Sequence, residues 1–369
     1  MKKLGFGLMR LPLTNPDDTK SIDKPEVCRM ADLFLERGFT YFDTAYMYHE
    51  SESERAVKDV LMTRIDRDRY TLASKLPVSM LKEEADVERI FNDQLAKTGA
   101  EYFDYYLLHA LSRNNYETAN RLDCFGFVQK KMAEGKVRHF GFSFHDSAEM
   151  LDRILTEHPE VEFVQLQLNY LDWEDKKVQS HKCYDTAVKH GKKVVVMEPV
   201  KGGTLAKLPE KAEKLLREVH PDWSNASWAV RFAASLENVM VVLSGMSTME
   251  QMEDNSSYMQ DFAPLSEDEK KVLEQVVEII HESAKIPCTA CRYCVEGCPQ
   301  QVAIPEYFAL YNEELTDRGN PLHKERYEQL AKEHGKASDC VECSQCEGIC
   351  PQHLQAISWL KKVAETFEK

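Results

Sequence analysis

Short apolar runs alternate with longer amphipathic stretches over the first 250 residues or so of the chain. The runs are rich in Val, Phe, Tyr and Leu, as expected for strands, and lie at 4–9, 39–45, 70–76, 102–109, 137–144, 163–170, 193–200 and 239–246. Segments between them, such as CRMADLFLERG, DVERIFNDQLAKTG and SWAVRFAASL, repeat apolar residues at helical intervals. Eight strand–helix units in about 250 residues predict a (β/α)8 barrel, also called a TIM barrel. A doubly wound open sheet is the alternative, but no G-x-G-x-x-G motif follows the first strand.

Beyond residue 263 the pattern is helical. The segment 264–286 opens with a capping-box pattern at Ser266 and Glu269 and predicts a charged connecting helix. Further on, IPEYFALYNEEL and HKERYEQLAKEH carry apolar residues at helical spacing, and the alternating strands of a compact βαββαβ ferredoxin are not visible. We therefore expect a barrel at 1–263, a connecting helix at 264–286 and a small, mainly α-helical domain at 287–369.

Eight of the 11 cysteines lie in the last quarter of the chain, in two runs of identical spacing. Each run reads C-x2-C-x2-C-x3-C-P, and the residues are Cys288, Cys291, Cys294 and Cys298, then Cys340, Cys343, Cys346 and Cys350. This spacing binds [4Fe–4S] clusters in bacterial-type ferredoxins, where the fourth cysteine of a run ligates the neighbouring cluster. We therefore expect two [4Fe–4S] clusters, with Cys350 completing the first set of three and Cys298 completing the second.

Other uses of these cysteines fit less well. Disulfides need an oxidising compartment, and structural zinc takes ligands in two pairs instead of a three-plus-one run that ends in Pro. Clusters with a purely structural role remain an alternative, but two interlocked clusters favour electron transfer to or from a redox partner. The scattered Cys28, Cys124 and Cys183 are most simply buried thiols.

Charge and hydropathy narrow the class of protein. With 47 basic and 62 acidic residues the net charge is −15, so the mean field repels phosphate and argues against a nucleic-acid partner. No run approaches the roughly 18 apolar residues of a membrane span. The opening MKKLGFGLMRLPL superficially resembles a signal peptide, but Arg10 interrupts it and no A-x-A site follows. We expect a cytoplasmic protein with no membrane insertion.

Polar side chains mark the ends of three consecutive predicted strands. Asp43 ends the second, with Tyr46 and Tyr48 just beyond it, Lys75 ends the third and His109 ends the fourth. In barrels of this kind functional groups gather at the carboxyl ends of the strands. A lysine ammonium beside a tyrosine lowers the pKa of the phenol, a carboxylate holds the lysine, and a histidine polarises a carbonyl oxygen. The set predicts acid–base chemistry on a carbonyl or alcohol.

The chain resembles the aldo-keto reductases, specifically the branch with a C-terminal ferredoxin-like extension. The resemblance covers the whole chain and rests on LGFGLMRLP, FDTAYMYHESESE, SKL, LLH, GFSFHD and SGMSTMEQMEDN. It implies a catalytic tetrad of Asp43, Tyr48, Lys75 and His109, with the D-T-A-x-x-Y spacing selecting Tyr48 over Tyr46. In that family the tyrosine is the general acid for a carbonyl reduced by hydride from a nicotinamide.

The resemblance also implies a cofactor cleft. Its expected residues are Gly7, Met9 and Arg10 along the cleft, Ser143 and Gln165 at the carboxamide, and Gly245, Ser247, Gln251 and Asn255 around the adenosine end.

Two departures from the family pattern concern the cofactor. Met197 stands where the family usually stacks an aromatic ring on the nicotinamide. Gly245 and Gln251 replace basic residues that grip the 2′-phosphate of NADP, and Glu250, Glu253 and Asp254 crowd the same stretch. The sequence thus indicates NAD(P)H without a strict NADP preference. His49, where Gly is common, marks an unusual substrate pocket.

Three hypotheses follow for the function. The first is an oxidoreductase that acts on a small carbonyl or alcohol with NAD(P)H, while the clusters exchange electrons with a partner. Because hydride carries two electrons and a cluster carries one, the second is a flavin- or cluster-dependent reductase that does not use simple NADPH hydride chemistry. The third is a non-catalytic barrel that serves as a sensor or docking platform. The intact tetrad argues against the third.

Overall fold

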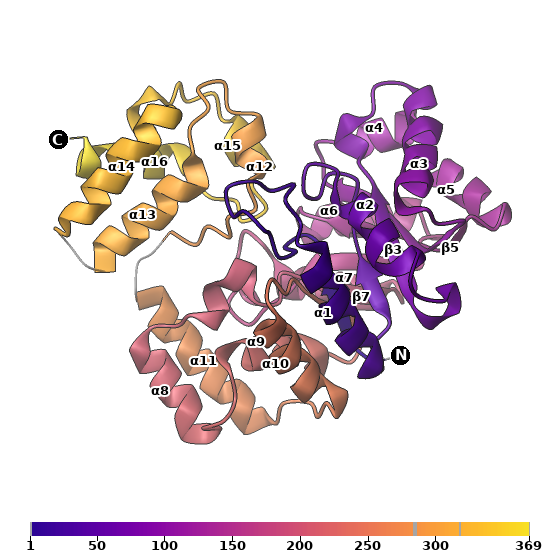
Figure 1. Ribbon diagram of the computed structural model, residues 1–369, viewed down its shortest axis with the longest axis horizontal. Coiled ribbons are helices and arrows are strands. Elements are labelled where there is room, and N and C mark those ends of the chain that lie inside the picture. Colours follow the sequence, from indigo (N-terminus) through magenta and orange to yellow (C-terminus); the bar gives the residue numbers. More distant parts are fainter. Residues whose placement is uncertain (1, 283–285, 317–318, 369) are drawn as a thin grey trace. The chain divides into compact units, whose positions relative to one another are not determined.

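A closed barrel of parallel strands forms the larger part of the molecule (Figure 1). The computed structural model describes residues 2–282, 286–316 and 319–368. Each strand pairs in parallel with the next, and β8 pairs with β1 to close the barrel. The strands are β1 Leu4–Gly7, β2 Tyr41–Asp43, β3 Thr71–Leu76, β4 Phe103–Leu111, β5 Val137–Phe144, β6 Phe163–Gln167, β7 Lys193–Met197 and β8 Val239–Ser244. All eight predicted strands are confirmed, and several end earlier than expected because the chain leaves the sheet toward the rim loops.

Helices follow the strands along the chain. Those of the first 260 residues are α1 Lys24–Glu36, α2 Ser53–Val57, α3 Glu84–Thr98, α4 Tyr116–Arg121, α5 Cys124–Ala133, α6 Ala148–Glu157, α7 Ser180–Lys189, α8 Glu210–Val219, α9 Asn225–Ser235 and α10 Met249–Gln260. Local signals set their starts: the side chains of Asp23, Ser147 and Ser224 each accept a hydrogen bond from the backbone N–H three residues later. Short helical turns lie at Lys58–Met62, Arg67–Arg69, Val78–Met80 and Lys201–Ala206.

The inside of the barrel is a packed layer of side chains. It consists of Tyr41, Ala73, Leu107, Phe163, Val195, Val241 and Leu243, all buried. Gly141 of β5 belongs to the same level, because a Cβ there would lie 2.6 Å from the ring of Phe163. The layer is a solid floor, so any chemistry must take place above it, at the carboxyl ends of the strands.

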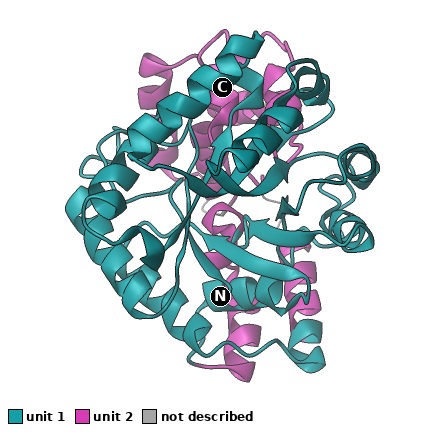
Figure 2. Ribbon diagram, turned by 90° about the vertical axis from the view of Figure 1, so that its right-hand side faces the viewer, with its two compact units in different colours: residues 1–200, 222–271 teal, residues 201–221, 272–369 magenta. Residues whose placement is uncertain are grey.

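Residues 201–221 and 272–369 form a second compact unit, whereas residues 1–200 and 222–271 form the first (Figure 2). The later helices are α11 Glu267–Glu282, α12 Tyr293–Glu296, α13 Ile304–Thr316, α14 Pro321–Glu333, α15 Gln345–Ile349 and α16 Ala356–Phe367, with a short turn at Ala337–Asp339. The core of the second unit includes Tyr307, Phe308 and Val363, and Tyr327 stacks on Phe367 with ring centroids 5.1 Å apart. The described residues of this unit contain no β-strand, which confirms the expected helical character.

The connecting helix begins as predicted. The Oγ atom of Ser266 accepts from the N–H of Glu269 at 3.3 Å, and the Glu269 carboxylate accepts from the N–H of Ser266 at 2.6 Å, which is a capping box. The predicted stretch 283–285 lies outside the described residues. The boundaries at 263 and 286 stay predictions. The compact units differ from them mainly in that 201–221, which follows β7, groups with the C-terminal residues.

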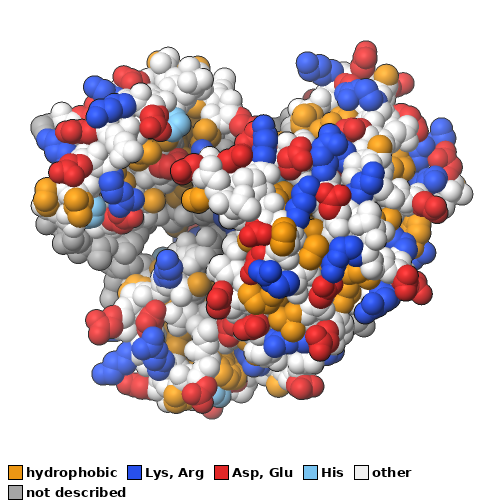
Figure 3. All heavy atoms as spheres, in the orientation of Figure 1, with side chains coloured by type: hydrophobic (Ala, Val, Ile, Leu, Met, Phe, Trp, Pro, Cys, Tyr) orange, Lys and Arg blue, Asp and Glu red, His pale blue; other side chains and the backbone are white. Residues whose placement is uncertain are grey.

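The surface carries mixed charge. Acidic and basic side chains are interspersed on the face drawn in Figure 3, and ion pairs such as Lys24–Asp59 and Arg64–Asp32, both 2.7 Å, link neighbouring elements. Exposed ion pairs of this kind contribute about 0–1 kcal/mol each to the free energy of unfolding, so they are a minor part of the stability of the fold. Of the helices in the described ranges, none is both long and apolar enough to cross a bilayer.

Candidate functional site

The predicted catalytic residues stand directly above the floor of the barrel. Side chains two residues apart on a strand point the same way, so each polar residue follows its floor residue by two. Asp43 follows Tyr41, Lys75 follows Ala73 and His109 follows Leu107. The three residues are buried, and the strands that carry them are neighbours in the barrel. The fold thereby brings the predicted set together.

Lys75 is the centre of this group. Its Nζ atom donates to Oδ1 of Asp43 at 2.5 Å and to the carbonyl oxygen of Thr44 at 2.9 Å, and it lies 3.4 Å from the Tyr48 hydroxyl. The imidazole of His109 meets the Tyr48 ring edge-on, with centroids 6.0 Å apart. Since the lysine is fully buried, its ammonium is fixed at the phenol by these two acceptors.

Burial dominates the protonation of the group. It raises the pKa of Tyr48 well above its usual value, and the Asp43 and Glu198 carboxylates add to the rise, which Arg10 opposes. Burial therefore outweighs the expected lowering by the nearby Lys75 ammonium, and the phenol is held protonated. Burial likewise drives the pKa of His109 well below its usual value, with Lys75 contributing, so the imidazole is neutral.

In the Asp43–Lys75 ion pair, burial and mutual attraction act on the two pKa values in opposite directions. Burial raises the pKa of Asp43 and lowers the pKa of Lys75, and the attraction between the two groups opposes both shifts. Together the four residues present one neutral proton donor, Tyr48, and one neutral imidazole, His109. This arrangement can donate a proton to an oxygen atom at the barrel mouth and take it back.

The other tyrosine of the loop, Tyr46, is engaged elsewhere. The ammonium of Lys97, on α3, lies 3.8 Å from the centroid of the Tyr46 ring. Tyr48, by contrast, approaches Lys75. The structure therefore places the tyrosine selected by the D-T-A-x-x-Y spacing, and not Tyr46, at the buried ammonium.

Residues expected at the nicotinamide continue the same level of the barrel. Ser143 follows Gly141 by two on β5, and its Oγ atom accepts from the N–H of Ala110 at 2.7 Å. Gln165 on β6 donates through Nε2 to the Met197 sulfur at 3.5 Å. Its Oε1 atom is buried and has no hydrogen-bond partner within the described part of the chain. An orphaned buried acceptor needs a donor, and an amide N–H2 is such a donor.

The residues expected at the adenosine end lie after β8 and on α10. Ser247 donates to the carbonyl oxygen of Arg10 at 2.7 Å, and its N–H donates to Oε1 of Gln251 at 2.8 Å. Asn255 is buried and donates to Ser244 at 2.8 Å, so it braces the loop from inside. Gly245 is exposed, and a Cβ there would touch the Arg10 side chain at 3.4 Å.

The residues expected along the cleft come from the end of β1. Gly7 ends the strand in a buried position beside Ser244, whereas Met9 and Arg10 are half-buried in the loop beyond. The Arg10 guanidinium lies 3.9 Å from the Glu198 carboxylate, across the barrel mouth from β1 to β7. Arg10 and Glu198 thus face each other at the barrel mouth, and Glu198 adds a carboxylate there.

Sequence reasoning missed two acidic residues. Glu198 directly follows Met197, and its place at the end of a predicted strand was the available signal. Glu54 is fully buried on α2 and accepts from Ser74 and from Gln94 at 2.7 Å each. Because Gln94 also donates to the carbonyl oxygen of Lys75 at 3.0 Å, this network fixes the strand that carries the lysine.

His49 fills the position after Tyr48 in a left-handed conformation, with φ of 52°. Its Nε2 atom accepts from the N–H of Leu11 at 3.1 Å, and Nδ1 faces the carbonyl oxygen of Thr19 at 2.7 Å. Burial lowers the pKa of this histidine, in line with a neutral ring that both accepts and donates. The residue pins the loop after β1 to the loop that carries Tyr48.

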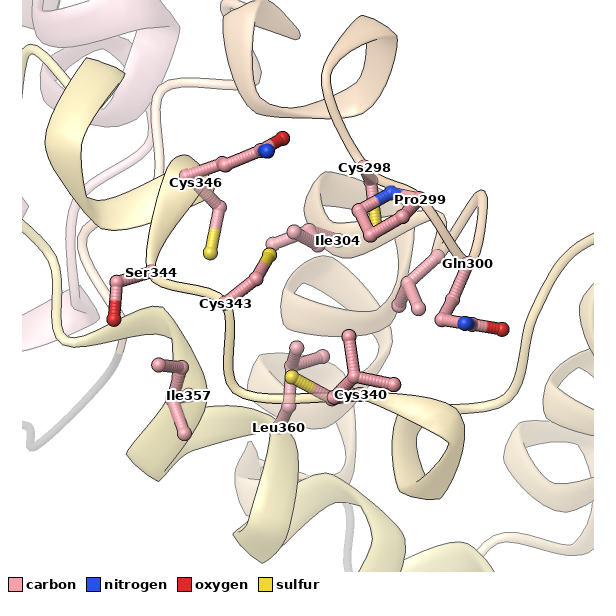
Figure 4. A pocket seen from close by; sticks show the side chains of 13 residues that line it. Cys298, Pro299, Gln300, Ile304, Cys340, Cys343, Ser344, Cys346, Ile357 and Leu360 are labelled. Carbon is pink, nitrogen blue, oxygen red and sulfur yellow. The ribbon is translucent and has the colours of Figure 1, made fainter.

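The eight cysteines of the two runs surround two cavities in the second unit. Cys288, Cys291, Cys294 and Cys350 line one of about 380 Å³. Cys298, Cys340, Cys343 and Cys346 line the other, of about 340 Å³, and Figure 4 shows their side chains around a common space. The first cavity also has Cys346 in its lining, so it takes three cysteines from the first run and two from the second, whereas the second cavity takes three from the second run and one from the first. Each expected set of four therefore lines one cavity, and its ligation of a cluster stays a prediction.

The cysteines are not gathered around a point. Among the described residues, no three His, Cys, Asp or Glu side chains are placed to hold a single metal ion. In a [4Fe–4S] cluster each thiolate binds a different iron, so its ligands stand apart around a volume. Burial raises the pKa of Cys294 to about 12 and that of Cys346 to about 11, and neighbouring cysteines contribute to both rises. The donor set fits a cluster.

Comparison with solved structures identifies the same barrel in other proteins. The aldo-keto reductase AKR11C1 from Bacillus halodurans, in its holo form, is 24% identical with a TM-score of 0.60, over 74% of this chain and 91% of that one. An aldo-keto reductase from Klebsiella pneumoniae in complex with NADPH is 19% identical with a TM-score of 0.57, over 74% and 90%. An aldo/keto reductase from Brucella melitensis is 22% identical with a TM-score of 0.56, over 74% and 94%. No curated protein matches the chain significantly.

Sequence profiles of two families match the chain. The profile of the 4Fe-4S dicluster domain matches residues 287–356, which contain all eight cysteines of the two runs. The profile of the Aldo/keto reductase family matches residues 3–278, which is most of the chain. The protein is therefore an oxidoreductase of the aldo/keto reductase family that carries a C-terminal 4Fe-4S dicluster domain.

Proposed function

We propose that this protein reduces a small carbonyl compound, or oxidises the corresponding alcohol, with a nicotinamide cofactor at the barrel mouth, and that two [4Fe–4S] clusters exchange electrons with a redox partner. The observation that carries the proposal is the Tyr48 hydroxyl, held 3.4 Å from a fully buried Lys75 ammonium that is itself fixed by Asp43. A barrel that served only as a docking platform has no use for a buried ammonium at a buried phenol.

The residues divide the work of the reaction. Tyr48 holds the proton that the carbonyl oxygen receives, because burial raises the pKa of its phenol and keeps it protonated at neutral pH. The Lys75 ammonium stabilises the phenolate left after transfer, and Asp43 keeps the lysine in place. His109 is neutral, so it can donate a hydrogen bond to the substrate oxygen without adding a charge.

A nicotinamide fits the polar groups beside the tetrad. The Gln165 Oε1 atom is an acceptor without a partner in the described chain, suited to a carboxamide N–H2 group, and Ser143 lies on the neighbouring strand. When bound, the cofactor supplies hydride to the carbonyl carbon. Met197 offers a polarisable thioether at this level, which packs against a ring with less shape specificity than an aromatic residue. The Glu198 carboxylate at the same mouth is paired with Arg10.

The thiols of the second unit suit two clusters. The four cysteines expected at each cluster line the same cavity, and thiolates are the ligands that iron–sulfur clusters take. Clusters pass single electrons, whereas hydride transfer moves a pair. This mismatch favours one alternative, a flavin in the barrel that converts between pairs and single electrons. The flavin alternative is also supported by Met197, which occupies the position where the family usually has an aromatic ring that stacks on the nicotinamide.

The role of Tyr48 is tested with two matched variants. Tyr48→Phe should lower carbonyl turnover by roughly 100-fold or more while cofactor binding is kept, because only the proton donor is lost. Tyr46→Phe removes a hydroxyl from the other tyrosine of the loop, whose ring lies on Lys97, and should leave turnover within about twofold. Equal loss in both variants, or no loss in Tyr48→Phe, contradicts the proposed acid.

The cofactors are tested on anaerobically purified protein. We expect a broad iron–sulfur absorption and about eight irons per chain, with no flavin band. Bleaching of the cluster absorption on addition of NADH or NADPH alone would require a group that splits the electron pair, and together with a flavin band it would favour the alternative. Fewer than about four irons per chain would overturn the two-cluster assignment.

A further inference from the structure

The loop after β7 belongs to the unit that carries the cysteines. Residues 201–221 group with 272–369, although about 50 residues of the first unit separate the two segments in the sequence. The loop opens with Lys201, Gly202 and Gly203, in a short helical turn that runs to Ala206. Two contacts join this turn to the cluster-binding segments.

Lys201 is the first contact. Its side chain is buried, with 3% exposed, and its Nζ atom donates to Oε1 of Gln352 at 2.6 Å. Gln352 comes two residues after Cys350 and is itself buried. It lines the first cavity together with the four cysteines of that set. A buried ammonium is thus one side chain away from the first cluster cavity.

Gly202 is the second contact, and it is independent of the first. It has φ of 62°, and a Cβ there would lie 2.6 Å from both the carbonyl oxygen and the Cβ atom of Thr289. Thr289 directly follows Cys288, is buried and also lines the first cavity. The loop therefore packs against both ends of the first cysteine set: the segment after Cys288 and the segment after Cys350.

We propose that the loop at 201–203 is part of the binding site of the first cluster, and that the Lys201 ammonium raises the reduction potential of this cluster above the value it would have without the charge. The inference rests on the proposed assignment of two clusters. The inference concerns only the first cluster, because no residue of the loop at 201–203 lines the second cavity.

The physical basis is electrostatic. On reduction the cluster gains one electron from the reductant, breaks no bond and takes up no proton, so its net charge becomes more negative by one. Net charge, burial and hydrogen bonding around the sulfurs set the potential of such clusters. A cation held in a buried position is poorly screened, so it stabilises the reduced form more than the oxidised form. The hydrogen bond to Gln352 keeps the ammonium beside the cavity.

The test is a redox titration of the anaerobically prepared holoprotein, followed by electron paramagnetic resonance. At a fixed applied potential, Lys201→Met should lower the ratio of reduced to oxidised first cluster by about tenfold, the order expected for one charge acting over a side chain's length at an effective dielectric constant near 20. Lys201→Arg keeps the charge and should stay within about twofold of the wild type. The signal of the first cluster is identified as the one lost in Cys291→Ser.

The second cluster is the internal reference. Its ratio should not change in either lysine variant. An unchanged first cluster in Lys201→Met, or equal shifts in both clusters, would overturn the inference. Should Lys201→Met fail to load iron, Lys201→Gln removes the charge while keeping a polar side chain, and the same tenfold fall is expected. Gly202→Ala, which pushes the loop from Thr289 and keeps the lysine, should shift the first cluster in the same direction by less.

Iron content separates this inference from the proposed function. If the wild type holds about eight irons and only the lysine variants fail to shift the first cluster, the loop assignment is wrong and the two-cluster proposal stands. If the wild type holds fewer than about four irons, the two-cluster assignment itself has failed.

Discussion

Replacing Lys75 with methionine isolates the charge at the centre of the candidate site. Lys75 is fully buried and 2.5 Å from the Asp43 carboxylate, which is buried as well. Methionine is similar in length and apolar, so it fills most of the space without forming an ion pair. The substitution strands a carboxyl group inside the barrel, and the main cost should come from that group.

The size of the cost follows from proton linkage. Burial already raises the pKa of Asp43 from its ordinary 3.8, and without Lys75 nothing on the neighbouring strand opposes the rise. A carboxyl whose folded pKa exceeds its unfolded pKa loses stability as pH rises from the unfolded value to the folded value, by about 1.4 kcal/mol per pH unit. If Asp43 stays protonated, the cost reaches about 4 kcal/mol at pH 7 and about 2 kcal/mol at pH 5. The value at pH 7 agrees with the 3–5 kcal/mol or so typical of a broken buried ion pair.

Urea unfolding followed by tryptophan fluorescence measures this cost. Three of the four tryptophans, Trp173, Trp223 and Trp228, belong to the barrel unit and report on it. The difference in unfolding free energy between wild type and Lys75→Met should shrink by about 2–3 kcal/mol from pH 7 to pH 5. The double variant Asp43→Asn with Lys75→Met carries no stranded carboxyl, so its deficit should be smaller at pH 7 and nearly independent of pH.

Two results would refute the reasoning. A Lys75→Met deficit that is the same at pH 5 and pH 7 would mean that the loss arises from packing and not from the carboxyl group. A double variant as unstable as the sum of its single variants would mean that Asp43 and Lys75 do not act as a pair.

Two further predictions concern protonation and cluster ligation. Burial lowers the pKa of His109, so the unfolded chain binds this proton at higher pH than the folded chain does, and stability is lost as pH falls below about 6.5. From pH 7.5 to 5.5 the unfolding free energy of the wild type should fall by about 1.4 kcal/mol more than that of His109→Gln. An equal fall in both proteins would contradict a neutral histidine. In anaerobic preparations, Cys350→Ala should lose the same cluster signal as Cys288→Ala and keep about half the iron, whereas Cys298→Ala should match Cys340→Ala. If Cys350→Ala instead matched Cys340→Ala, each run would hold its own cluster.

The barrel could be predicted from the sequence because its signals are local. Strand-forming runs and their spacing decide the number of units. Period-two alternation decides which residues face inward, so the sequence alone indicates that Asp43, Lys75 and His109 face inward at the carboxyl ends of their strands. The spacing also predicted that Cys298 lines a cavity with the second run and Cys350 lines one with the first.

The features that the sequence did not predict depend on burial and on contacts between distant residues. The pKa of Tyr48 rises because the phenol is enclosed, which no spacing indicates. The network of Glu54 with Ser74 and Gln94 joins three elements, whereas in the sequence Glu54 is one of three Glu residues in HESESE and looks like a surface acid. The grouping of Lys201 with Gln352 joins residues 151 positions apart.

The discontinuity of the second unit has a consequence for how such a protein can be divided into fragments. A carrier module appended to the end of a gene can be cut off or exchanged at one junction. Here a fragment that begins at residue 272 leaves behind 201–221, a stretch encoded inside the catalytic portion, and a fragment that stops at 271 keeps that stretch without its counterpart. The fragment that begins at 272 is therefore not a complete compact unit. Transplanting the iron-carrying tail onto another reductase will require transferring that internal stretch with it.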